Sequence, residues 1–189
     1  MTDQEIRLIE TIFVCSILLV SAFVYILMST TPKKSFFQLW VTDSNGLVLR
    51  PVLPVSSNQS YLMTLGVQNT MGCIEYCRLT TKFQSAPLLN VSAASAELGN
   101  FRFFLLDNET WTKTFSFIVN STTEGDMIRI HGIGLDDSYF SINLTSTFDF
   151  NQNGFFWQFR FELWAFNTSS NNFDFTNTWA SSPFLNITR

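Results

Sequence analysis

Residues 154–167, GFFWQFRFELWAFN, constrain the fold of this chain most, because they form either a membrane-crossing helix or a strand of a water-soluble sheet. A helix crossing the bilayer would bury Arg160 and Glu162 near its middle, which costs about 2.5 to 3.5 kcal/mol for each residue. The stretch is also shorter than the roughly 20 residues that such a helix needs. Its apolar residues recur at a spacing of two, as on one face of a strand. We therefore predict a strand with one face in a core and polar groups interleaved with exposed aromatics on the other.

The remainder of the chain after residue 35 repeats this pattern in short segments. Asn45-Gly46 lies between two apolar runs and predicts a hairpin, because both residues accept positive φ. Residues 84–99 are small and polar, which indicates a loop or a short helix. Roughly eight short strands without a long amphipathic helix indicate an antiparallel β-sandwich. A mostly β domain is thus expected over residues 35–189.

The N-terminal segment has a different character. No charged residue occurs from Thr11 to Pro32, and TIFVCSILLVSAFVYILMS is apolar at nearly every position. That length matches the roughly 20 residues that cross the hydrocarbon of a bilayer. We predict a single transmembrane helix at about residues 8–30 within an N-terminal segment 1–34. A cleaved signal peptide and a pilin-like helix packed in a filament core are the alternatives, but an Ala-x-Ala site and the basic residue and Gly expected before a pilin helix are missing.

The side of the membrane is indicated by two opposing features. Lys33 and Lys34 follow the apolar segment, and by the positive-inside rule they alone would place the following domain in the cytosol. Seven Asn-x-Ser/Thr acceptor sites, all after the helix, favour a glycosylated extracellular domain. Plain richness in Asn, Ser and Thr is the alternative explanation. The acceptor residues are Asn58, Asn90, Asn108, Asn120, Asn143, Asn167 and Asn186.

Three cysteines give a weaker signal in the same direction. Cys15 lies in the apolar helix, where a thiol behaves as a small hydrophobe. Cys73 and Cys77 are the remaining pair, and an even pair in an external domain favours a local disulfide. Free thiols are the second interpretation. A two-ligand metal site is the third, although tetrahedral zinc takes four ligands and His131 is the single histidine.

The candidate sites for chemistry have simpler structural explanations. DFNQNG at residues 149–154 resembles the first half of a calcium loop, but position twelve is Arg160, so we interpret it as a polar hairpin tip. Asp136 and Asp137 fit a solvated turn, and a lone His131 on a strand fits a structural role. No nucleophile elbow, phosphate loop or zinc-protease motif is present, so we predict no catalytic, metal or cofactor site. The net charge of −4 without a long basic run excludes a nucleic-acid partner.

Aromatic residues supply the contact prediction. Charged residues are only 14% of the chain whereas Phe occurs 21 times, so exposed rings are expected. Trp40, Trp164 and Trp179 are the predicted partner-contact residues.

Several motifs occur in order within about residues 36–167, namely SFFQLWVTDSNGLVLRPVLPV, LGVQN, EYCRLT, NETWTKTFSF and FRFELWAFN. Their order resembles an uncharacterised archaeal membrane-protein family. The resemblance implies an immunoglobulin-like external domain with no assigned activity. The chain differs from the family in Cys73 and Cys77, which lie near the strand that contains LGVQN.

These observations predict a non-enzymatic, single-pass membrane protein with an extracellular β-sandwich. We expect membrane lipid around the helix and protein partners in a membrane or cell-surface complex, in which the chain is an accessory or structural subunit. A tethered ligand- or glycan-binding module and a pilin-like filament subunit are the alternatives.

Overall fold

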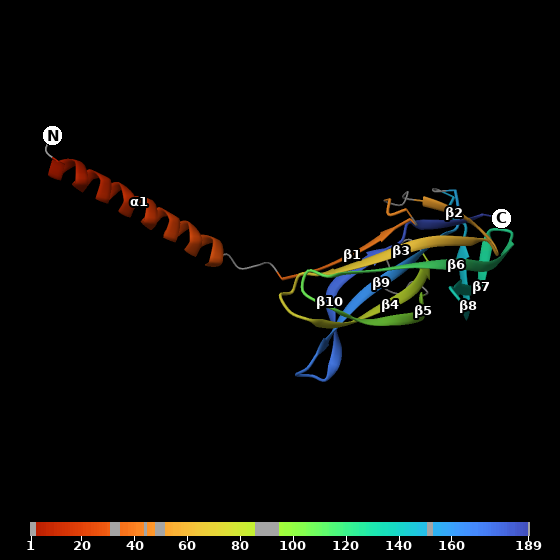
Figure 1. The fold of residues 1–189 in the computed structure, drawn as a ribbon. Coiled ribbons are helices and arrows are strands. Elements are labelled where there is room, and N and C mark those ends of the chain that lie inside the picture. Colours follow the sequence, from red (N-terminus) through yellow and green to blue (C-terminus); the bar gives the residue numbers. More distant parts are fainter. Residues whose placement is uncertain are drawn as a thin grey trace. The chain divides into compact units, whose positions relative to one another are not determined.

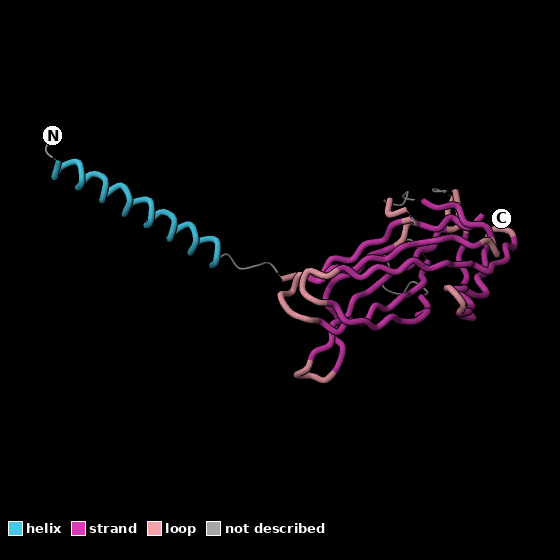
Figure 2. Tube along the Cα trace, viewed as in Figure 1, coloured by secondary structure: helices cyan, strands magenta, loops and turns pink. Residues whose placement is uncertain are grey.

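The computed structural model describes residues 3–30, 35–43, 45–47, 52–85, 95–150 and 153–188. Within these ranges the chain forms one helix followed by eleven strands (Figures 1 and 2). The chain divides into two compact units, Met1–Lys34 and Ser35–Arg189.

The first unit contains α1 (Asp3–Thr30). The hydroxyls of Ser16 and Ser21 donate to the carbonyl oxygens four residues earlier, which satisfies the polar groups of an otherwise apolar segment. The helix predicted at about residues 8–30 is therefore confirmed. Among the described residues we find no helix with both the length and the hydropathy needed to cross a bilayer. That this helix crosses a membrane stays a prediction.

The second unit consists of two sheets. The five-stranded sheet has the order β1-β3-β6-β7-β8, and each neighbouring pair is antiparallel. Its strands are β1 (Phe37–Thr42), β3 (Ser60–Asn69), β6 (Thr110–Glu124), β7 (Met127–Leu135) and β8 (Ser138–Thr147).

The six-stranded sheet has the order β2-β11-β9-β4-β5, and β10 also pairs with β9. Its strands are β2 (Val52–Ser56), β11 (Phe184–Thr188), β9 (Phe156–Asn167), β4 (Glu75–Ser85), β5 (Ser95–Leu105) and β10 (Asn172–Ser181). The predicted mostly β architecture in two sheets is confirmed. The pairing is antiparallel except between β2 and β11, which run parallel.

The core lies between the two sheets and is dominated by aromatic rings. Phe159 on β9 is fully buried and packs against Phe83 and Phe117, with ring centroids 5.1 Å away in both cases. Phe117 comes from the five-stranded sheet, so these contacts join the two layers. Alternate residues of β9 point into this core, as the period of two predicts.

The structure answers the question raised by residues 154–167: residues 156–167 form the strand β9, as predicted. The exposure predicted for its second face is wrong in part. Gln158 is only 2% exposed and Glu162 is also buried, because β9 has hydrogen-bonded neighbours along both edges. Side chains of those neighbours crowd the outer face as well.

Two local predictions are corrected by the tertiary structure. A turn forms at Asn45-Gly46, where Gly46 has φ of 78° and the Asp43 carboxylate accepts from the N–H of Asn45. The flanking strands nevertheless do not form a hairpin, since β1 pairs with β3 and β2 lies in the other sheet. Both ends of the loop expected at residues 84–99 are strand instead, because β4 continues to Ser85 and β5 begins at Ser95; residues 86–94 lie outside the described residues.

Candidate interaction surface

The outer face of the six-stranded sheet carries rows of outward side chains that run directly across neighbouring strands. In one row, Arg102 of β5 is opposite Arg78 of β4, Arg78 is opposite Trp164 of β9, and Trp164 is opposite Phe175 of β10. We call this surface the aromatic–basic face. Its members are Tyr76, Arg78, Lys82, Glu97, Arg102, Phe104, Arg160, Glu162, Trp164, Phe166, Phe173, Phe175 and Trp179.

Arg78 lies among aromatic rings on this face. Its guanidinium carbon is 5.0 Å from the Trp164 ring centroid and 4.8 Å from that of Phe173. Arg102 lies 5.7 Å from the same Phe173 ring. Such cation–π contacts hold a guanidinium in place without neutralising its charge. Within the part of the chain that the structure describes, neither arginine has a hydrogen-bond acceptor or a carboxylate partner from a side chain.

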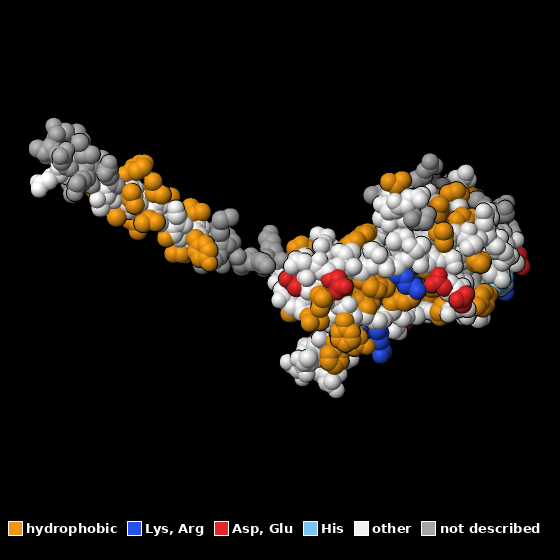
Figure 3. Space-filling model, viewed as in Figure 1, with side chains coloured by type: hydrophobic (Ala, Val, Ile, Leu, Met, Phe, Trp, Pro, Cys, Tyr) orange, Lys and Arg blue, Asp and Glu red, His pale blue; other side chains and the backbone are white. Residues whose placement is uncertain are grey.

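A cluster of rings continues from the arginines toward the β9–β10 hairpin. Tyr76 stacks on Phe104 with centroids 4.5 Å apart, and Phe166 meets Phe173 at 5.4 Å. Phe104 is 68% exposed although it belongs to a well-packed sheet. Figure 3 shows hydrophobic side chains beside this hairpin with a basic side chain next to them. Tyr76, Phe166 and Phe173 are half-buried beside it, and a cluster of rings that reaches the surface in this way is typical of contact surfaces.

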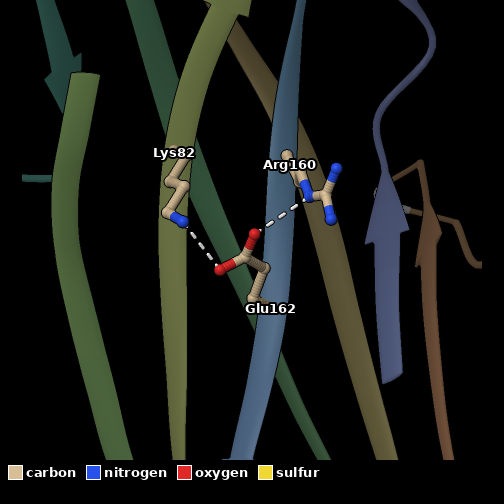
Figure 4. Close-up of polar contacts among 3 residues, drawn as sticks. All are labelled: Lys82, Arg160 and Glu162. Carbon is tan, nitrogen blue, oxygen red and sulfur yellow. Dashed lines mark hydrogen bonds and ion pairs between the residues drawn. The ribbon is translucent and has the colours of Figure 1, made fainter. Parts of the chain in front are cut away.

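Farther along the same face, Glu162 is held between two basic residues (Figure 4). Lys82 Nζ donates to one carboxylate oxygen at 2.8 Å, and Arg160 Nε lies 3.0 Å from the other. The guanidinium of Arg160 also lies 4.8 Å from the Trp179 ring centroid. This carboxylate is therefore paired with Lys82 and Arg160. Within the described residues it forms no ion pair with Arg78 or Arg102.

The three predicted contact tryptophans do not share one surface. Trp164 and Trp179 lie on the aromatic–basic face, and Trp179 is 49% exposed. Trp40 belongs to β1 of the other sheet, where its ring covers Gly66 of β3. The arginines of the face were not predicted. The sequence does contain a hint, because side chains two residues apart on a strand point to the same face: Arg78 is two residues from Tyr76, and Arg102 is two residues from Phe104.

Both cysteines of the predicted disulfide are free, so that prediction is corrected. Cys77 points into the core from β4, whereas Cys73 is exposed in the loop before it and donates to the Glu75 carboxylate at 3.1 Å. Burial, and then the charge of Glu75, raise the pKa of Cys77 to about 12. The hydrogen bond to Glu75 is the main cause that raises the pKa of Cys73.

The predicted glycosylation residues occupy different environments. Asn58, Asn108, Asn143 and Asn167 are exposed, in turns, on β8 or at the end of β9. Asn120 and Asn186 are partly buried, and the Asn186 side-chain oxygen accepts from the N–H of Phe155. Asn90 lies outside the described residues. None of the six described asparagines belongs to the aromatic–basic face.

The remaining candidates have structural roles. Asp149 and Gly154 exchange two backbone hydrogen bonds, which closes a tight hairpin end, while residues 151–152 lie outside the described residues.

Asp136 sits in a turn with φ of 49° and its carboxylate accepts from the Ser116 N–H. His131 Nε2 is 2.8 Å from the Thr122 hydroxyl. Among the described residues, no group of three or more His, Cys, Asp or Glu is placed to hold a metal.

A groove of about 540 Å³ lies near one end of the two sheets. Phe37 of β1, Glu75 of β4, Phe166 of β9 and Asp174 of β10 are among its lining residues. Asn167, whose side-chain nitrogen donates to the Asp174 carboxylate at 2.7 Å, also lines it. The groove therefore combines rings with acidic groups.

Comparison with known proteins gives little further information. No protein-family model matches this chain, and no curated protein matches it. A β-glucosidase from Listeria innocua is 13% identical over 82% of this chain and 16% of its own length, with a TM-score of 0.37. The sporulation control protein Spo0M from Bacillus subtilis is 8% identical over 82% of this chain and 50% of its own, with a TM-score of 0.38.

A CARDB domain from Pyrococcus furiosus, solved in complex with di-metal ions, is 13% identical over 82% of this chain and 89% of that domain, with a TM-score of 0.36. The chain thus spans only about a sixth of the β-glucosidases and half of the Bacillus subtilis protein. These likenesses are too weak to give this chain a function or a fold family. The resemblance to an archaeal membrane-protein family stays a prediction.

Proposed function

We propose that this protein is a non-enzymatic accessory or structural subunit of a membrane or cell-surface complex, and that it binds its protein partner through the aromatic–basic face. The observation that carries the proposal is the row Arg102, Arg78, Trp164 and Phe175, in which two cations without a described carboxylate partner are followed by two large rings across four strands. Arg, Trp and Tyr are the residues that dominate the binding energy of protein interfaces. Aromatic rings and arginines are also enriched in such interfaces relative to other surfaces.

A protein contact is favoured over a sugar-binding surface because the ring faces are already packed against other side chains. A sugar platform requires a ring face that is free to stack on the ligand. Trp164 instead lies under the Arg78 guanidinium and against Phe175, and Tyr76 is stacked on Phe104. Rings that already pack on one another suit the close-packed centre of a protein interface.

Membrane anchoring through α1 is the second part of the proposal. Residues 11–26 expose apolar side chains on all sides of the helix, among them Phe13, Leu19 and Phe23. No charged residue interrupts the sequence from Thr11 to Pro32. A helix that is apolar all round requires an apolar environment, which lipid supplies.

An immunoglobulin-like sandwich on the outer side of the cell membrane is the third part. The exposed acceptor residues Asn58, Asn108, Asn143 and Asn167 support it, since each could carry a glycan without disturbing the core. Asn58, Asn108 and Asn143 are not on the strands that carry the aromatic–basic face, so glycans there would leave that face open to a partner, whereas Asn167 directly follows Phe166 of the face. Asn186, which packs against Gly154, should stay unmodified.

A tethered ligand-binding module is the second candidate function, favoured by the groove of about 540 Å³. Its size is in the range of small-molecule sites, which is about 300 to 1,000 Å³. The carboxylates of Glu75 and Asp174 would suit a cationic or hydroxyl-rich ligand.

Extraction of the native protein tests these proposals. We expect the protein to stay in the membrane pellet after alkaline carbonate, to be released by mild detergent, and to elute with a protein partner well above the 21.6 kDa of one chain. Intact-mass measurement should show glycan additions, and protease added to whole cells should cleave the sandwich. A monomer carrying a small ligand would favour the second candidate. Release by carbonate, or protection of the sandwich in intact cells, would contradict the proposed anchor or orientation.

A further inference from the structure

Two arginines face each other across neighbouring strands. Arg78 of β4 and Arg102 of β5 are directly opposite in the register of the sheet. Like charges in this position destabilise a sheet, and a chain with net charge −4 has carboxylates that could have neutralised them. Within the described residues no side-chain carboxylate does so. An arrangement that costs folding free energy and is left uncompensated is typical of a binding site.

The surrounding rings fix both guanidinium groups. Phe173 lies 4.8 Å from Arg78 and 5.7 Å from Arg102, so one ring is shared by both cations. Trp164 covers Arg78 on a further side. The Nε atom of Arg78 is buried, so the terminal nitrogens of its guanidinium are the donors left for a ligand. Together with the guanidinium of Arg102, these donors are matched to the oxygens of a carboxylate or another oxyanion.

The charge of the whole face indicates the sign of the ligand. The outward residues of these strands include four cations, Arg78, Arg102, Lys82 and Arg160, against two carboxylates, Glu97 and Glu162. Glu162 is engaged by Lys82 and Arg160, as described above. The exposed ring of Phe104 adjoins the two arginines, so apolar contact is available beside the charge.

We propose that Arg78 and Arg102 form a paired-arginine site that binds a carboxylate in an acidic segment of a protein partner, with apolar side chains of that segment packed on Phe104 and Tyr76. This inference rests on the proposed function and names the chemistry of the partner. A protein segment is favoured over a lipid headgroup or an anionic glycan because the site joins two cations to a stacked, apolar ring pair. A segment with a carboxylate next to aliphatic side chains complements both parts.

Titration of the full-length protein in detergent micelles tests the site. The Nε–Hε signals of arginine are followed by NMR and assigned with Arg→Lys variants. The probe is the blocked peptide acetyl-Leu-Glu-Leu-Glu-amide, and acetyl-Leu-Gln-Leu-Gln-amide is the neutral control. We expect the acidic peptide to shift the Arg78 and Arg102 signals in a saturable way and the neutral peptide to leave them unchanged. Arg129, which is exposed on β7 of the other sheet, should not respond.

Matched variants measure the contribution of each residue. Arg78→Gln and Arg102→Gln should each weaken peptide binding at least tenfold, because one fork of the pair is lost. Arg129→Gln removes the same charge from the opposite face and should change binding less than twofold. Unfolding curves of the variants show whether a lost signal reflects misfolding. Arg78→Lys, which keeps the charge, should also weaken binding, since it removes the fork.

The inference is overturned if the acidic peptide leaves both signals unmoved, or if Arg129→Gln weakens binding as much as Arg78→Gln. It is also overturned if phosphatidylserine vesicles or a sulfated oligosaccharide shift the two signals at lower concentration than the peptide. Its failure can be separated from that of the proposed function. A native hetero-complex that survives both Arg→Gln substitutions would contradict the paired-arginine site but not the proposed function. Peptide binding by the two arginines in a protein that forms no native complex would contradict the proposed function but not the site.

Discussion

The charge of Glu162 should stabilise the sandwich measurably, and Glu162→Gln tests this with little change of volume. The Glu162 side chain is only 10% exposed, whereas those of Lys82 and Arg160 are about a third exposed. A hydrogen bond to a charged group contributes about 1.5 to 3 kcal/mol. Fully exposed ion pairs contribute about 0 to 1 kcal/mol. Because a largely buried carboxylate here meets partly solvated cations, we expect Glu162→Gln to lower the free energy of unfolding by about 1 to 3 kcal/mol.

Urea unfolding of the full-length protein, followed by tryptophan fluorescence, measures this loss. All five tryptophans lie after residue 35, so the signal reports on the sandwich and not on α1. A cycle with Lys82→Met and the double variant gives the coupling energy, which we expect near 1 kcal/mol. Lys113→Met is the matched control, since its pair with Asp136 is longer, at 3.3 Å, and more exposed on both sides.

The control should cost less than about 1 kcal/mol, as for other exposed pairs. A loss below about 0.5 kcal/mol for Glu162→Gln, the usual range of a surface substitution, together with zero coupling, would refute the reasoning from burial. The cluster would then be equivalent to an ordinary exposed ion pair.

Three further predictions concern the core, a thiol and a close contact. Phe159→Ala should lower the free energy of unfolding by about 3 to 5 kcal/mol because it leaves a cavity between the sheets, whereas Trp179→Ala, at an exposed position, should cost much less; urea titration compares them. Cys77, with a pKa of about 12, should react with iodoacetamide at pH 8 only after unfolding. Since that pKa is raised above the ordinary 9.0, the thiol of the unfolded chain loses its proton at a lower pH than the thiol of the folded chain. The free energy of unfolding should therefore be constant below about pH 8 and fall as pH rises from 9 toward 12. Gly66→Ala should cost about 1 to 3 kcal/mol because a Cβ would overlap the Trp40 ring, and thermal unfolding should show a smaller cost in a Trp40→Ala background.

The candidate surface was only partly predictable from the sequence. The sequence predicts contact rings at Trp164 and Trp179, and both lie on one face. Trp40 is predicted by the same criterion but lies on the other sheet. The alternation of side chains along a strand shows which residues share a face, but it does not show which sheet the strand joins. Arg78 and Arg102 were missed, since two arginines in different strands carry no signal until the register places them opposite each other.

The sequence alone determined the local elements. The uninterrupted apolar run gives α1, the period of two gives β9 with Phe159 on its inner side, and Asn45-Gly46 gives a turn, because each depends on residues close together in the chain. Tertiary structure decided which strands pair. It placed β2 beside β11 in parallel and β1 beside β3, and it buried Gln158 and Glu162 on the second face of β9. These outcomes depend on which apolar faces can be buried together in one core, and no short stretch of sequence contains that information.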